Sequence, residues 1–255
     1  MPSVASLEAL QRAAADFAVT DLSLVIEPSA LAAARRSLDE SGLLLLGEVH
    51  GVRENPLIAR ALMQAFGLTG LALEWHEDLA PVAGAFCSGG ALADHPLLWS
   101  GDGRITAGHL AVLRERAAAG PLRLSLFDGT IEADWSWSQH NEAMARRILA
   151  APAAGAGTLV VAGNAHTPTT STRLGLPLGA YIARQRPGVR EIRISYGAGR
   201  YYNIEPRQFR SRIGPGGRHL RLHQQRDTLI FDLPAAGEAL VPQRDQPWPG
   251  GPHPR

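Results

Sequence analysis

Hydrophobic residues in this chain gather in short continuous runs, and between the runs apolar positions recur every three or four residues. A short apolar run bounded by turn signals is typical of a buried β-strand, whereas the wider spacing is typical of an amphipathic helix. The runs predict strands at residues 43–47, 70–75, 122–127, 158–162, 191–196 and 228–233. The helical spacing predicts helices at residues 7–17, 28–37, 56–66, 78–86, 106–119, 138–149 and 177–186.

Predicted strands and helices alternate over most of the chain. This alternation predicts an α/β fold with a mostly parallel central sheet flanked by helices. No linker divides the sequence, so we expect a single α/β domain over residues 1–245 with its core at about 40–235. We expect residues 88–102 to be irregular and residues 213–219 to form a glycine-rich turn. The Pro- and Gly-rich residues 246–255 are expected to be a disordered tail.

The composition narrows the classes of function. A net charge of +1 gives no reason to expect a nucleic-acid or membrane partner. Every basic side chain is Arg, which excludes a Schiff-base lysine and a P-loop lysine. Cys87 is the one cysteine, so no internal disulfide forms, and its context does not activate the thiol. No segment reads as a signal peptide or a membrane span, so we expect a cytoplasmic protein.

Two strand ends repeat one pattern. Residues 43–50 read LLLLGEVH and residues 159–166 read LVVAGNAH. Functional groups in parallel sheets gather beyond the carboxyl ends of the strands. We therefore expect His50 and His166 to face one pocket from different strands. Side chains at i and i+2 project to the same side, which adds Glu48 beside His50 and Asn164 beside His166.

Other polar side chains follow the remaining strands. Glu74 and His76 close the second strand, and Asp128 follows the third. We interpret His50, Glu48, Glu74 and His166 as the catalytic candidates. The substrate-binding candidates are Arg53, Glu54, His76, Asp128, His140 and Asn164. The stretch Trp135-Ser136-Trp137 fits core or rim packing better than a substrate cleft.

Imidazole beside a carboxylate is a general base, because the carboxylate fixes the tautomer and stabilises the imidazolium. His50 is therefore expected to remove a proton, and Arg53 is expected to hold a developing oxyanion. His166 is expected to act either as an acid that donates to the leaving group or as an orienting group. Alternatively, His50, Glu74 and His166 could bind a divalent metal with an open position for water. A serine nucleophile elbow and a dinucleotide-binding glycine motif are both absent from the sequence.

The segment LLLLGEVHGVRENP, followed by LALEWH, resembles the erythromycin esterase-like and ChaN-like superfamily. The related TIKI and TraB/GumN proteins also carry a G-x-x-H and a G-N-x-H motif, which match residues 47–50 and 163–166 here. HNEAMARRIL before the second motif, and PLGAYIARQ followed by IRISYGAG, resemble later family segments. The resemblance covers roughly residues 40–200.

The resemblance implies different activities by branch. Erythromycin esterase-like enzymes are hydrolases whose first-strand His activates water without a metal; TIKI-type members are metal-dependent proteases, and ChaN-like members are haem-binding lipoproteins. By motif match, His50 carries over as the base, with Glu48, Glu74 and His166 as its partners. Arg53 and Glu54 take the positions of polar loop residues. The family's Arg-Asp pair is His140-Asn141 here, which predicts a changed substrate or reaction.

We therefore expect a hydrolase-like enzyme that cleaves an ester or amide in a small molecule or peptide. A biosynthetic tailoring enzyme that uses the same base for elimination or cyclisation remains an alternative. A haem-binding protein and a metal-dependent peptidase are the other two. We expect no cofactor, with a divalent metal as the alternative and haem disfavoured by the lack of a lipobox cysteine and the few Tyr and Met residues. The sequence does not predict the oligomeric state.

Overall fold

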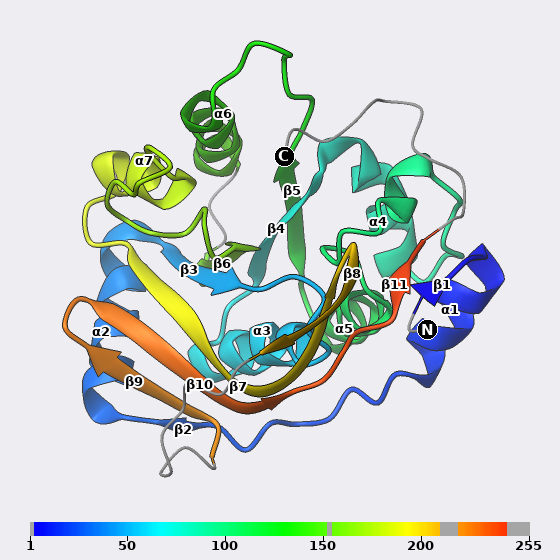
Figure 1. Ribbon diagram of the computed structural model, residues 1–255. Helices are drawn as coiled ribbons and strands as arrows, with labels where there is room; N and C mark the ends of the chain where they lie inside the picture. Colours follow the sequence, from blue (N-terminus) through cyan, green and yellow to red (C-terminus); the bar gives the residue numbers. More distant parts are fainter. Residues whose placement is uncertain (1–2, 152–154, 210–218, 244–255) are drawn as a thin grey trace.

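The protein folds around one large β-sheet, shown by a computed structural model that describes residues 3–151, 155–209 and 219–243 (Figure 1). Within these residues the strand order is β2-β9-β10-β7-β3-β6-β4-β5, and β8 pairs with β7 off this path. The strands of this sheet are β2 (Val25–Ile26), β3 (Leu43–Glu48), β4 (Gly70–His76), β5 (Arg123–Asp128), β6 (Thr158–Gly163), β7 (Arg190–Asn203), β8 (Glu205–Phe209), β9 (Arg221–Gln225) and β10 (Thr228–Ala236). A separate pair joins β1 (Ser3–Val4) to β11 (Val241–Pro242).

Helices cover both faces of the sheet, as a buried parallel sheet requires. Along β3, Leu44 and Leu46 belong to one hydrophobic core and Leu45 to another on the opposite face. Figure 1 shows α6 and α7 on one side and α3 and α5 on the other. The helices are α1 (Leu7–Asp16), α2 (Pro28–Ser41), α3 (Asn55–Phe66), α4 (Ala80–Cys87), α5 (Ala107–Ala119), α6 (Trp137–Ala150) and α7 (Leu178–Gln185), with short 3-10 helices at Glu77–Leu79 and Pro96–Trp99.

Local sequence explains how helices begin near the strand ends. Ser136 and Gln139 form a capping box at the start of α6, so each side chain satisfies a free backbone N–H of the first turn. Thr106 caps α5 by accepting a hydrogen bond from the backbone N–H of His109. These caps fix the first turns of two helices that supply residues to the site described below.

Four strand ends meet at one edge of the sheet. Strands β3, β6, β4 and β5 are neighbours and run parallel, so their carboxyl ends lie side by side. In register, Glu48 of β3 pairs with Gly163 of β6, and His76 of β4 pairs with Asp128 of β5. The edge therefore gathers the polar residues that follow each strand.

The predicted α/β fold with a largely parallel central sheet is confirmed. Each predicted strand and helix is present, although α2 runs to Ser41 and β7 continues to Asn203. The sequence analysis missed β8 and β9, which pair antiparallel with β7 and β10 and carry many polar residues. The predicted tail 246–255 lies outside the described residues, as does the predicted turn at 213–219 except for its last residue.

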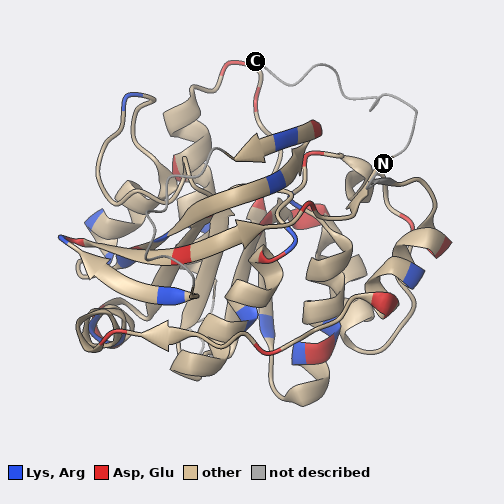
Figure 2. Ribbon diagram, turned by 60° about the horizontal axis from the view of Figure 1, so that its bottom comes forward, with Lys and Arg blue, Asp and Glu red and all other residues tan. Residues whose placement is uncertain are grey.

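None of the described helices combines the length and the apolar character needed to cross a membrane. In the view of Figure 2, acidic and basic residues are mixed over the helices and loops, and neither sign gathers on one face. This mixture agrees with the small net charge of the chain.

Candidate active site

His50 and His166 approach the same carboxylate oxygen. The Nε2 atom of His50 lies 4.0 Å from Oε1 of Glu74, and the Nε2 atom of His166 lies 3.7 Å from the same oxygen. Glu74 is held in place because its Oε2 accepts a hydrogen bond of 2.6 Å from the backbone N–H of Gly163, at the end of β6. Two imidazoles that are distant in the sequence therefore converge on one buried carboxylate.

Glu48 orients the His50 ring. Its Oε1 atom lies 3.3 Å from Nδ1 of His50, and the carboxylate is buried at the end of β3. An ionised carboxylate only accepts hydrogen bonds, so it favours the tautomer in which Nδ1 carries the hydrogen. The Nε2 atom of His50 then carries the lone pair and faces Glu74.

Asn141 orients the His166 ring in the same way. Its Nδ2 donates to the carbonyl of Trp137, and its Oδ1 accepts from the backbone N–H of Leu178. These two bonds fix the amide so that Oδ1 faces Nδ1 of His166 at 2.7 Å. Nδ1 of His166 must therefore carry a hydrogen, which leaves the Nε2 lone pair directed to the cleft.

Trp137 and His140 frame the His166 ring from the first turn of α6. The Trp137 ring stacks on the His166 ring with centroids 5.5 Å apart and planes at 20°. The His140 ring meets His166 edge to face, and its Nε2 lies 2.8 Å from Oδ1 of Asp128. The helix thus restricts the rotation of His166 from two sides.

Arg104 connects three carboxylates. Its Nε lies 2.7 Å from Asp102, and its Nη1 lies 2.6 Å from Asp128 and 3.4 Å from Oε1 of Glu74. Its backbone is held by Asp102 and by the indole N–H of Trp75, which donates to the Arg104 carbonyl. No described residue accepts a hydrogen bond from Nη2, although the guanidinium lines the cleft.

The charged neighbours set the protonation of the centre. Burial lowers the pKa of His50, but the Glu48 hydrogen bond and the Glu74 charge outweigh it and raise that pKa above 6.5. Burial favours the neutral acid at Glu74, yet His166, His50 and Arg104 hold its pKa below the usual range. The pKa of Asp128 is lowered against its burial by the hydrogen bond from His140 and the charge of Arg104.

Two buried imidazoles behave in the opposite way. Burial lowers the pKa of His166, and the charge of Glu74 only partly offsets this effect. Burial also lowers the pKa of His109, which packs against Trp75 and contacts the Thr106 hydroxyl. At neutral pH the ring of His166 is therefore neutral, and His50 is the more basic of the two imidazoles near Glu74.

The loop that carries His50 is fastened to distant segments. The hydroxyl of Tyr196 accepts a hydrogen bond from the backbone N–H of Val49 and donates to Asn55, which in turn donates to the Val49 carbonyl. The N–H of Gly51 donates to the Gly103 carbonyl, and its own carbonyl accepts from residues 202 and 239. A φ of 74° at Gly51 and its close approach to residue 202 both require glycine.

These groups line a cleft of about 540 Å³, a volume typical of small-ligand sites. Its polar lining contains Glu74, Asp102, Arg104, Asp128, His140 and His166, and its apolar lining includes Leu97, Ile131 and Trp137. A much smaller hollow adjoins the cleft and shares Glu74, Trp75 and Arg104 with it. Glu48, His50 and His109 line this hollow.

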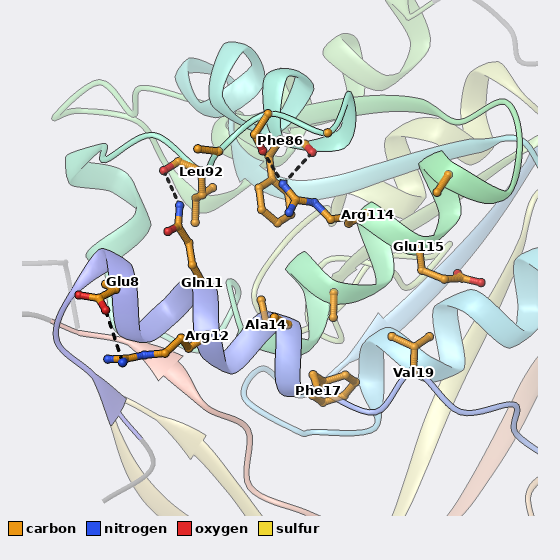
Figure 3. A pocket seen from close by; sticks show the side chains of 16 residues that line it. Glu8, Gln11, Arg12, Ala14, Phe17, Val19, Phe86, Leu92, Arg114 and Glu115 are labelled. Atoms are coloured by element: carbon orange, nitrogen blue, oxygen red, sulfur yellow. Dashed lines mark hydrogen bonds and ion pairs between the residues drawn. The ribbon is translucent and has the colours of Figure 1, made fainter.

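A larger and more apolar pocket of about 670 Å³ lies between α1 and α5, as Figure 3 shows. Arg114 stacks on Phe86 there and donates to the carbonyls of Phe86 and Gly90, while Gln11 donates to the Leu92 carbonyl. Among the described residues, no histidine lines this pocket. The acid–base groups lie in the smaller cleft and its adjoining hollow, which we take as the candidate active site.

The structure brings together most of the predicted site residues. The four catalytic candidates, His50, Glu48, Glu74 and His166, form the centre, and Asp128 and His140 lie beside it. His76 lines the cleft, and its Nδ1 accepts a hydrogen bond from the backbone N–H of residue 78.

Three of the predicted substrate-binding residues lie outside this group. The Arg53 guanidinium is 5.7 Å from the Phe17 ring, which lines the pocket of Figure 3. Glu54 accepts a hydrogen bond from the backbone N–H of Gly237. The Asn164 side chain is exposed, and its backbone N–H donates to the Glu48 carbonyl. The turn after His50 rotates Arg53 and Glu54 away, so neither lines the cleft.

Arg104 and Asp102 are the main functional candidates that the sequence analysis missed. Asp102 ends the segment predicted to be irregular, and Arg104 follows it by two residues, so no periodicity marks either residue. Asn141 was noted only as part of the altered His140-Asn141 pair, and Trp137 was interpreted as packing. The sequence signal available for Arg104 was the segment GDGR, in which two glycines flank an acid. In the structure both glycines have a positive φ.

A divalent metal fits these residues poorly. The Arg104 guanidinium lies 3.4 Å from the Glu74 oxygen that a metal shared with His50 and His166 would need, so two cations would compete for it. Within the described ranges, no group of three or more His, Cys, Asp or Glu residues is arranged to hold a metal ion. We therefore derive no chemical step through a metal.

Comparison with known proteins identifies the fold and no family. No protein-family model and no curated protein matches the chain. A solved Bacillus cereus protein superposes with a TM-score of 0.60 over 94% of both chains at 12% identity. A weaker likeness is to the type III effector HopBA1, with a TM-score of 0.46 and 17% identity over 86% of this chain and 92% of that chain. Another is to RRSP, a MARTX toxin effector domain from Vibrio vulnificus, with a TM-score of 0.43 and 17% identity over 78% of this chain and 39% of that chain. At these identities, the Bacillus cereus likeness supports a shared α/β fold and says nothing about activity.

Proposed function

We propose that this protein is a hydrolase that uses His50 as a general base to activate water against an ester or amide. The observation that carries the proposal is the convergence of His50 Nε2 and His166 Nε2 on one Glu74 oxygen, at 4.0 and 3.7 Å. Both rings also have a fixed tautomer that leaves Nε2 available. The motif resemblance to the erythromycin esterase-like superfamily supports the same reaction class. We also propose that the protein is located in the cytoplasm.

The proton leaves water through His50. Nε2 of His50 takes one hydrogen as the water oxygen attacks the carbonyl carbon, and Glu48 stabilises the imidazolium that forms. Collapse of the tetrahedral intermediate breaks the bond to the leaving group, which receives the proton from His50. Proton transfer of this kind contributes roughly a hundred- to ten-thousand-fold to the rate.

His166 orients the water in this scheme. Its lowered pKa keeps the ring neutral, so Nε2 accepts a hydrogen bond from the second hydrogen of the same water and does not act as a proton donor. The Glu74 carboxylate, whose Oε1 lies close to both Nε2 atoms, stabilises the positive charge that develops on His50. Of the two roles expected for His166, acid or orienting group, the structure supports the second.

Arg104 replaces Arg53 as the donor to the developing oxyanion. Its Nη2 has hydrogens that no described residue accepts, and the guanidinium is fixed by Asp102, Asp128 and Glu74. A preorganised donor at a developing negative charge is worth about 3 kcal/mol of transition-state stabilisation.

The test compares His50→Ala and His166→Ala with His223→Ala on a panel of chromogenic esters and amides. His223 lies on β9, pairs with Asp232 at 3.1 Å and lines neither the cleft nor the hollow, so it is a matched control. We expect at least a hundred-fold loss of kcat for His50→Ala and a smaller loss for His166→Ala. Full turnover in a folded His50→Ala variant would reject the proposal.

A further inference from the structure

The walls of the cleft and its hollow carry an excess of negative charge. Four carboxylates, Glu48, Glu74, Asp102 and Asp128, face one permanent cation, Arg104, among the described lining residues. With neutral imidazoles, the formal charge of this lining is −3. Residues 74, 102 and 128 each have a pKa lowered against burial by their cationic partners, so all three stay ionised at neutral pH.

One carboxylate oxygen in this lining is unsatisfied. Oε2 of Glu48 is buried and has no hydrogen-bond partner among the described residues, while Oε1 contacts His50. A buried acceptor without a donor is destabilising, and more so when it is charged. Glu48 lines the hollow of about 10 Å³ next to the cleft, which is about the space of one water molecule, so Glu48 adds negative charge beside the cleft without contacting a larger ligand.

The same cleft also has an apolar lining. Ile131, which is 49% exposed, lines it together with Leu97 and Trp137 beside the charged groups. A ligand that meets both kinds of surface has an apolar body and a polar end. An anionic end would meet the carboxylates in a partly desolvated space where charges interact strongly.

We infer that the cleft selects substrates with a cationic group, an ammonium, amidinium or guanidinium, attached to an apolar body beside the scissile bond, and rejects anionic substrates. This inference rests on the proposed function for its reaction, whereas the charge preference itself is a binding property. It therefore has a test that needs no turnover.

The test uses three flat probes of matched shape and different charge: benzamidinium, benzamide and benzoate. Isothermal titration calorimetry at low salt measures each dissociation constant. We expect benzamidinium to bind at least about ten-fold more tightly than benzamide, and benzoate to bind more weakly than benzamide. Equal binding of the three, a preference for benzoate, or no binding of benzamidinium in the millimolar range would overturn the inference.

Matched variants locate the binding. Glu48→Gln and Asp128→Asn each remove one negative charge from the lining, and Asp227→Asn removes one from an exposed side chain outside it. We expect the first two to reduce the benzamidinium preference several-fold and Asp227→Asn to leave it unchanged. An equal effect of Asp227→Asn would show that the preference reflects overall charge and would overturn the assignment to the cleft.

His50→Ala separates this inference from the proposed function. The variant is expected to lose turnover and keep the benzamidinium preference, because it removes a base and no carboxylate. Hydrolysis that favours carboxylate-bearing substrates would reject the charge preference alone. A retained preference in a wild-type protein that hydrolyses no ester or amide would reject the reaction alone.

Discussion

Asn141 accepts a hydrogen bond from Nδ1 of His166 at 2.7 Å, and the amide cannot turn over to donate instead. Its Nδ2 is occupied by the Trp137 carbonyl and its Oδ1 also accepts from Leu178. The tautomer of His166 is therefore set by the backbone of two helices, through one fully buried side chain.

Asn141→Ala is expected to release this constraint. We predict a kcat about ten- to hundred-fold lower, together with a stability loss of about 1–3 kcal/mol from the unsatisfied backbone groups. NMR of ring nitrogens checks the cause: the Nδ1–H signal of His166 should be present in the wild type and lost in the variant. Gln185→Ala, an exposed amide on α7, should change neither. An unchanged His166 tautomer in Asn141→Ala would contradict the assignment.

Glu48 is expected to set the pH at which the enzyme becomes active. The base form of His50 is required, and its pKa is raised by Glu48 and Glu74, so kcat/KM should rise with pH through a value above 6.5. Glu48→Gln removes a hydrogen-bonded charge that raises the pKa of His50. The rise of kcat/KM with pH, which is the ascending limb of the profile, should therefore move to lower pH while the maximal rate falls. The measurement is the pH dependence of kcat/KM. A limb that moves to higher pH would contradict this role.

Arg104 is expected to stabilise the fold as well as the site. Arg104→Met leaves Asp102, Asp128 and Glu74 without their shared cation, and we predict a loss of about 3 kcal/mol in urea unfolding at pH 7. The loss should shrink as the pH falls toward 4, because protonation removes the repulsion between the carboxylates. Arg146→Met, at an exposed pair with Glu142, should cost less than about 0.5 kcal/mol. An equal cost for the two variants would contradict the prediction.

Gly51→Ala is expected to disrupt the loop that carries His50. A Cβ atom there would lie 1.6 Å from the carbonyl oxygen of Tyr202, so backbone must move. Gly42→Ala is a matched control, because Gly42 has the same φ of 74° and open space around it. We predict about 1 kcal/mol of destabilisation for Gly42→Ala and at least about 3 kcal/mol, with loss of activity, for Gly51→Ala. Thermal unfolding of both variants distinguishes steric clash from simple backbone strain.

The sequence predicted the central part of this arrangement because strand periodicity is a local signal and the carboxyl ends of parallel strands lie at the same edge of a sheet. Once β3, β6, β4 and β5 are parallel neighbours, the positions of His50, His166 and Glu74 follow. Sequence patterns did not reveal Arg104, since its partners come from three other segments and its own loop has no periodicity. Arg53 was favoured by its closeness to His50 in the chain, but one turn of backbone directs it toward Phe17.

Strand β9 escaped prediction for a related reason. β9 alternates Arg, Leu, His and Gln, and only Leu222 is fully buried in it, so its apolar signal is weak. Its pairing with β10 and β2 depends on partners elsewhere in the chain. Short, half-exposed strands are thus stabilised by tertiary pairing more than by their own composition.

The hydrogen bonds at Gly51 connect two later residues, Tyr202 and Ala239, to the loop that carries the proposed base, His50. Tyr202 and Ala239 both donate to Gly51, one residue beyond the base, whereas none of the described residues after His166 lines the cleft. Truncation before Ala239 would remove one of these hydrogen bonds, and a proteolytic cut between Tyr202 and Ala239 would weaken them. In both cases the loop that positions the His50 ring would be held less firmly. Shortened versions of this protein, and reporter fusions in this segment, should therefore preserve the chain through Ala239.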